Sequence, residues 1–141
     1  MDFEISFSKT VSESDIYLFA GITGDFAPNH VNEAFMSKTP YKRRIAHGAL
    51  LVGYMSAAST MAVEQGLGAG AEATPVSLGY DRIRFLKPVF IGDTITVTYR
   101  VTAFDEIGSR SEAAIEVHNQ HGLLVAVAAH IMRWVKSVEP A

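Results

Sequence analysis

Apolar and polar residues alternate at the start of the chain. Phe3, Ile5 and Phe7 are separated by polar side chains, and this period of two is typical of a strand with one buried face. We therefore predict a strand over residues 3–11. A serine and several acidic residues follow, and they favour a short helix over residues 13–22.

The longest helical pattern begins at Gly48. Apolar and small residues recur there at intervals of three and four and leave almost no polar face, which indicates a buried helix over residues 48–65. Closely spaced glycines end this pattern. A shorter helix over residues 33–36 is expected upstream, with Asn32 as its cap.

The second half of the chain has the pattern of strands. Alternating apolar residues are interrupted by turn signals at Gly92-Asp93 and at residues 119–122. The predicted strands cover residues 74–85, 94–103, 111–118 and 123–135. One strand, a helical section with one long buried helix, and four antiparallel strands together make an α+β domain with a helix on a sheet.

The composition fits one compact domain over residues 1–141. With 48% hydrophobic and 19% charged residues, the chain can bury a core without disulfides or metal. The hydrophobic share is high for this size, so we expect some of it to be buried between subunits, in a homodimer or a higher homo-oligomer. The net charge is -3 and the basic residues gather on no single helix face, which gives nucleic-acid binding little support.

Several sequence features concern the cellular compartment of the protein. It has no cysteine, which excludes disulfides and a thiolate nucleophile. Its first four residues lack the basic and apolar regions of a signal peptide. Polar residues, among them Ser59 and Glu64, interrupt the longest apolar run, so we expect no membrane span. A cytoplasmic protein is the expectation.

Asp25 and His30 are candidate catalytic residues. They flank a short segment that contains Pro28, which restricts the backbone at and before its position. An Asp and a His can hold complementary protonation states near neutral pH. His47-Gly48 follows where the buried helix begins. We interpret this stretch as an active site.

These residues, in this order, resemble the MaoC-like dehydratases, a branch of the hot-dog fold that includes the (R)-specific enoyl-CoA hydratases. The family's motif is Asp-x-Asn-Pro-x-His, placed before a His-Gly that opens the central helix. Asp25, Pro28 and His30 match it, whereas Ala27 stands where the family has the Asn that helps to hold the catalytic loop. The resemblance covers nearly the whole chain, and its strongest points are residues 23–30, 46–51, 85–89 and Gly92-Asp93.

The resemblance implies a hot-dog domain, with a long central helix wrapped by an antiparallel sheet. It also implies an enzyme that adds water to a trans-2-enoyl-CoA to give an (R)-3-hydroxyacyl-CoA, or runs the reverse dehydration, with no cofactor. Coenzyme A is favoured as the carrier over acyl carrier protein. Asp25 and His30 would be the acid/base pair, with either one as the base.

Gly48 is the candidate donor to the thioester oxygen. A backbone N–H in the first turn of a helix has no partner within the helix and lies at the positive end of its dipole. Glycine also lets a carbonyl approach closely. An N–H aimed at the developing negative charge would stabilise the enolate.

Further residues are candidates for substrate binding. Val52, Met55 and Ser56 follow Gly48 along the helix, and Ser56 matches a family position that lines the acyl pocket. Basic residues are candidates for the phosphates of coenzyme A, and the alternative for each one is a solvated charge. These basic residues are Lys42, Arg43, Arg44, Arg82, Arg84 and Lys87.

We expect no metal site. His118, His121 and His130 lack a recognised ligand spacing, so surface or packing roles are expected for them. His47 is expected to be structural, as a helix cap or as a support for the site.

Two other functions stay open. Hot-dog thioesterases often use an acidic residue on the central helix, and Glu64 is the only one there, but it lies far from Gly48. The departure at Ala27 leaves open a non-catalytic subunit that binds acyl thioesters.

Overall fold

The computed structural model describes residues 3–68, 72–107 and 109–136. The strands are β1 (Phe3–Thr10), β2 (Ala73–Phe85), β3 (Thr94–Asp105), β4 (Arg110–His118) and β5 (Leu124–Lys136). The helices are α1 (Glu13–Thr23), α2 (Pro28–Val31), α3 (Glu33–Met36) and α4 (Gly48–Glu64). All strand pairs are antiparallel, which confirms the predicted α+β class.

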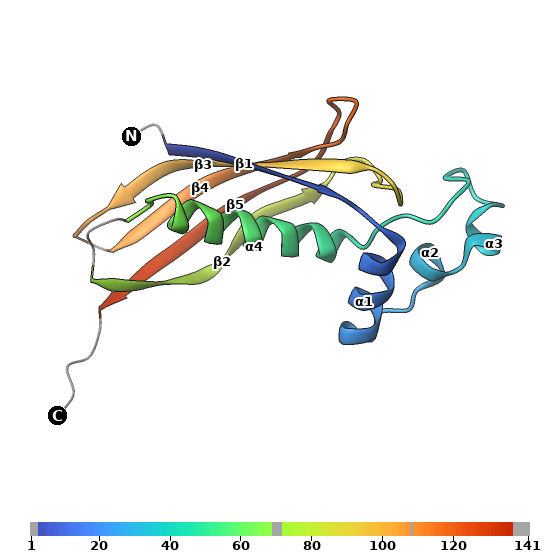
Figure 1. Cartoon of the computed structure of the whole chain (residues 1–141), viewed down its shortest axis with the longest axis horizontal. Helices are drawn as coiled ribbons and strands as arrows, with labels where there is room; N and C mark the ends of the chain where they lie inside the picture. Colours follow the sequence, from blue (N-terminus) through green and yellow to red (C-terminus); the bar gives the residue numbers. More distant parts are fainter. Residues whose placement is uncertain (1–2, 69–71, 108, 137–141) are drawn as a thin grey trace.

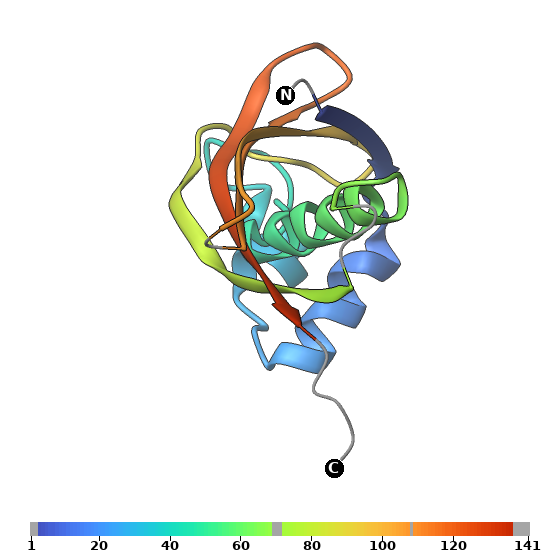
Figure 2. The same cartoon turned by 90° about the vertical axis from the view of Figure 1, so that its left-hand side faces the viewer.

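The sheet curls around α4 (Figures 1 and 2). Its strand order is β1-β3-β4-β5-β2, and alternate residues of the central strands point inward, as the period of two predicts. α4 supplies the other half of the core. The buried residues of α4 are Leu50, Leu51, Tyr54, Met55, Ala58, Ser59 and Ala62.

Two features differ from the sequence-based expectation. α4 is covered on one side only, because Ala49, Gly53, Ser56 and Thr60 form an exposed face of small residues. β2, the first of the four predicted strands, does not pair with β3. It lies at the sheet edge beside β5.

The three short helices gather at the N-terminal end of α4 (Figure 1). α1 begins with a capping box, in which the Ser12 hydroxyl accepts from the Asp15 N–H at 3.1 Å and the Asp15 carboxylate accepts from the Ser12 N–H at 3.0 Å. α1 ends at Gly24, whose φ of 85° is a left-handed conformation that glycine adopts without strain. The chain then enters the predicted active-site stretch.

α2 occupies a position where the sequence predicted only a turn. Pro28 begins this helix, and its fixed φ suits the first helical position.

None of the helices in the described residues is long and apolar enough to cross a membrane.

Candidate functional site

Three side chains meet where α1, α2 and α4 come together. Asp25, His30 and His47 each offer an oxygen or nitrogen atom, and these atoms lie within 4.8 Å of one another. Asp25 is exposed, whereas His30 and His47 are buried. The structure therefore brings the two predicted catalytic residues together, and His47 lies next to them.

The His30 ring is oriented by a backbone carbonyl. Its Nδ1 lies 2.7 Å from the carbonyl oxygen of Ile45. Because a carbonyl can only accept, Nδ1 carries the proton, and Nε2 keeps its lone pair in the neutral ring. The Ile45 N–H donates in turn to the Asn29 carbonyl at 3.0 Å. His30 is thus set up as an acid or base at one defined nitrogen.

Arg44 ties the segment before α4 to two of the short helices. Its guanidinium donates to the carboxylates of Glu13 and Glu33 at 2.7 and 2.8 Å and to the Tyr17 hydroxyl at 3.0 Å. The hydrogen bonds to Glu33 and Glu13 raise the Arg44 pKa further above its usual value. Arg44 was a candidate for coenzyme A phosphates, but here it already pairs with two carboxylates. It fixes the chain next to Ile45 instead.

His47 contacts both predicted catalytic residues. Its Nε2 donates to the carbonyl oxygen of Asp25 at 3.0 Å, and its ring stacks on His30 with centroids 3.8 Å apart. Its Nδ1 is buried without a hydrogen-bond partner in the described residues. His47 precedes α4, but its side chain does not cap the helix. His47 thus holds the Asp25 loop in place rather than capping α4.

The Asp25 loop is also held by short-range hydrogen bonds. The Asp25 N–H donates to the Thr23 hydroxyl at 3.2 Å, and the Asp25 carboxylate accepts from the Ala27 N–H at 3.3 Å. Ala27 is the N-cap of α2 and has no side-chain oxygen to offer to the helix. The position where the family motif has Asn is therefore a capping position, left without a cap here.

The three clustered side chains are poorly arranged for a metal ion. The rings of His30 and His47 are inclined by only 25° and are stacked. Their nitrogen lone pairs lie in the ring planes, so they run nearly side by side, whereas ligands of one ion converge on a point. The expectation of no metal stays a prediction.

A cavity of about 280 Å³ lies beside His30 and Gly48. Leu51 and Phe85 form part of its apolar wall, and Lys87 also lines it. No hydrogen bond among the described residues uses the Gly48 N–H, as expected at the start of a helix. A cavity lined by His30 and by a residue whose N–H is unpaired among the described residues can accommodate a carbonyl compound.

Packing gives a second reason for glycine at position 48. A Cβ placed there would lie 2.5 Å from a carbon of the Phe85 ring. Since real Cβ atoms do not approach that closely, any other residue would push the ring away. This contact could not be predicted from the sequence, because Phe85 is far from Gly48 along the chain.

The other predicted substrate residues lie in different surroundings. Met55 is fully buried in the core, Val52 is partly buried against it, and Ser56 is on the exposed face of α4. None of the three lines the cavity beside Gly48. Their role in acyl binding stays a prediction.

Of the six basic residues predicted as candidates for phosphate binding, Lys87 alone lines this cavity. Arg82 and Arg84 are exposed on β2, where the pairing register shifts between Asp81 and Arg84. Arg82 also has a φ of 53°, so the regular alternation that would place the two arginines on one face is interrupted. Their part in binding phosphate stays a prediction.

Comparison with known proteins places these features in a family. The MaoC like domain family matches residues 1–123. A protein named (R)-specific enoyl-CoA hydratase from Rhodospirillum rubrum is 47% identical over 97 residues, which cover 69% of this chain and 62% of that protein. A 3-hydroxybutyryl-CoA dehydratase from Methylorubrum extorquens is 39% identical over 66% of this chain and 54% of its own length. The matches thus span less than two thirds of either relative.

A solved structure has the same fold. The (R)-hydratase from A. caviae involved in PHA biosynthesis superimposes with a TM-score of 0.79 at 28% identity, over 92% of both chains.

Proposed function

Since the chain belongs to the MaoC-like domain family, we propose that it is a hydro-lyase that adds water to a trans-2-enoyl-CoA. The product would be an (R)-3-hydroxyacyl-CoA, and the reverse reaction would be a dehydration. The proposal is supported above all by the proximity of Asp25 to His30, which lines a cavity together with Gly48. The relatives named hydratase and dehydratase support the same class of reaction.

The proposed mechanism places one water between Asp25 and His30. One of the two groups takes a proton from the water as its oxygen bonds to C3 of the substrate. The other delivers a proton to C2 on the same face, and the pair returns to its starting state by passing the proton between atoms less than 4.8 Å apart. The enolate oxygen that forms between these steps would accept from the Gly48 N–H. Side-chain and backbone groups suffice, so the proposed reaction needs no cofactor.

The direct test is hydration of crotonyl-CoA, followed as loss of the absorbance of the conjugated thioester. Asp25→Asn and His30→Ala should each lower kcat by at least about 100-fold, because each removes a proton-transfer group. Thermal unfolding of each variant checks that the fold is retained. Activity close to wild type in either folded variant would overturn the assignment.

The thioesterase alternative gains no support from the geometry. Glu64 is the last residue of α4, so it lies roughly 24 Å along the helix axis from Gly48. It is exposed and does not line the cavity beside Gly48. Release of free thiol from an acyl-CoA, lost in Glu64→Gln, would be the result that favours this function.

We also propose that the protein is a homodimer or a higher homo-oligomer. The edge strand β2 exposes Val76 and Leu78, and the exposed face of α4 carries small residues that permit close approach. An edge strand with apolar side chains is a surface that proteins commonly cover. Sedimentation equilibrium should give at least twice the mass of one chain, and a monomer at micromolar concentration would contradict the proposal. The expected cytoplasmic location stays a prediction.

A further inference from the structure

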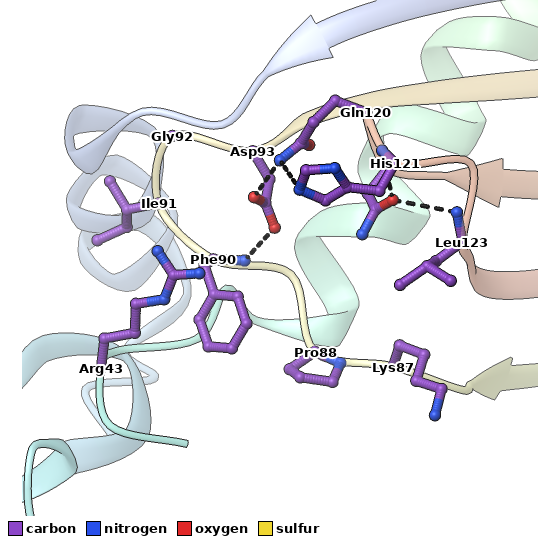
Figure 3. A pocket seen from close by; sticks show the side chains of 11 residues that line it. Arg43, Lys87, Pro88, Phe90, Ile91, Gly92, Asp93, Gln120, His121 and Leu123 are labelled. Carbon is purple, nitrogen blue, oxygen red and sulfur yellow. Dashed lines mark hydrogen bonds between the residues drawn. The ribbon is translucent and has the colours of Figure 1, made fainter.

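A second cavity, of about 670 Å³, adjoins the one beside Gly48. Figure 3 shows the residues that line the second cavity. The two cavities share Lys87 and Pro88. The walls of the second come from Arg43, from the turn between β2 and β3, and from the β4–β5 hairpin. A ligand longer than one cavity could therefore extend from the catalytic residues into the second cavity.

Among the described residues, the cationic side chains of this cavity, Arg43 and Lys87, have no acidic partner. The Arg43 guanidinium lies over the Phe90 ring, 3.9 Å from its centroid (Figure 3). Such stacking uses the face of the guanidinium and leaves its N–H groups, which lie in its plane, able to donate. Within the described parts of the chain, neither Arg43 nor Lys87 forms a side-chain hydrogen bond or an ion pair.

The carboxylate in the same cavity is already engaged. One oxygen of Asp93 accepts from the Phe90 N–H and the other from the Gln120 side chain, both at 2.9 Å. Gln120 in turn accepts from the Thr94 N–H at 3.0 Å, and its amide lies 3.4 Å from Nε2 of His121. Asp93 thus links the turn before β3 to the β4–β5 hairpin. The Arg43 and Lys87 side chains remain available to an anion.

We propose that this cavity binds the 3′-phosphorylated ADP end of an acyl-CoA, with Arg43 and Lys87 contacting its phosphates. This assignment rests on the proposed function. The cavity is far larger than one phosphate needs and lies within the size range of small-molecule sites. Phe90, Ile91 and Leu123 add apolar surface for the base and the ribose.

The position of the cavity also distinguishes coenzyme A from acyl carrier protein as the carrier of the acyl group. The acyl group would lie beside Gly48, and the flexible arm of the carrier would cross Lys87 and Pro88. An acyl carrier protein presents the same arm without a nucleotide, so it would leave the second cavity empty. The geometry therefore favours coenzyme A thioesters.

The test compares crotonyl-CoA with crotonyl-pantetheine, which lacks the nucleotide. Arg43→Gln should raise KM for crotonyl-CoA about 10-fold, since a charge-assisted hydrogen bond is lost, and should leave kcat within about twofold. KM for crotonyl-pantetheine should not change. Arg110→Gln is the matched control, because Arg110 begins β4 at the end away from the hairpin, and it should behave as wild type with both substrates.

A binding experiment separates this proposal from the proposed function. Adenosine 3′,5′-bisphosphate should bind the wild-type protein about 10-fold more tightly than Arg43→Gln in calorimetry, whether or not crotonyl-CoA is hydrated. With an active enzyme it should compete with crotonyl-CoA. Equal binding by both proteins, absence of binding, or binding without competition would overturn the assignment, as would an equal rise of KM for both substrates.

Discussion

His47 acts on the site through one hydrogen bond and one ring contact. Its Nε2 donates to the Asp25 carbonyl, and its ring stacks on His30. His47→Phe keeps a ring against His30 but leaves that carbonyl without a donor. We expect kcat for crotonyl-CoA to fall about tenfold with little change in KM, since the Asp25 loop loses a fixed point.

The matched variant is His47→Gln, because its amide can place an N–H near the position of the imidazole Nε2. It should recover most of the lost kcat. The same kcat in wild type and His47→Phe would show that the bond to Asp25 does not position the catalytic loop.

At the residue scale, the sequence could suggest candidate side chains and the Gly48 N–H, but not the backbone carbonyl that orients His30. Asp25 and His30 could be predicted as a pair because their spacing around Pro28 matches a motif. The Ile45 carbonyl that orients His30 could not, since every residue has a carbonyl and only the fold selects one. The contact of Phe85 with Gly48 was likewise hidden by their distance along the chain.

At the element scale, the start of α2 offers the clearest prediction. Ala27 is its N-cap and provides no side-chain acceptor, and the helix has only four residues. In Ala27→Asn, the new amide oxygen could accept from the N–H of Asn29 or His30. We expect the free energy of unfolding to rise by about 1 kcal/mol, which corresponds to roughly 3 °C in Tm.

A more stable α2 should also improve catalysis, because His30 belongs to this helix. We expect kcat to rise in Ala27→Asn, measured beside Tm on the same preparation. Ala27→Gln is the control, since its longer amide caps helices poorly. Equal effects of Asn and Gln would show that capping is not the missing contribution.

The longer elements were predictable because each repeats its pattern many times. α4 and the five strands fall close to their predicted ranges. α2 was not predicted, whereas α3 has the same length and was predicted, because Asn32 offers α3 a side-chain cap and Ala27 offers none to α2. The one-sided burial of α4 was missed because its exposed face carries only small, uncharged residues, so no charged side chain marks this face as exposed to solvent.

At the scale of the whole molecule, pairing order was the information that the sequence lacked. The pattern of β2 predicts a strand but does not say that it joins β5 at the sheet edge. The second cavity depends on that order as well, since it forms between the turn before β3 and the hairpin before β5. Arg43 could be named as a candidate phosphate ligand, but its partners could not.

The same strand order creates a buried polar cluster that should make stability depend on pH. His130 on β5 is fully buried, with Nε2 2.8 Å from the Ser77 hydroxyl and Nδ1 2.7 Å from the Tyr99 hydroxyl. These contacts join β2, β3 and β5. Burial lowers the His130 pKa from about 6.5 to about 4, because the charged ring would lose its hydration.

The sign of the effect follows from this lowered pKa. Between pH 6.5 and 4 the unfolded chain takes up a proton at His130 that the folded protein does not, so stability should fall as pH falls through this window. Unfolding in urea should show a loss of up to about 3 kcal/mol across it. His130→Gln keeps the hydrogen-bonding character without the titration. Since carboxylates titrate in both proteins, the difference between their curves isolates His130, and parallel curves would contradict the assignment.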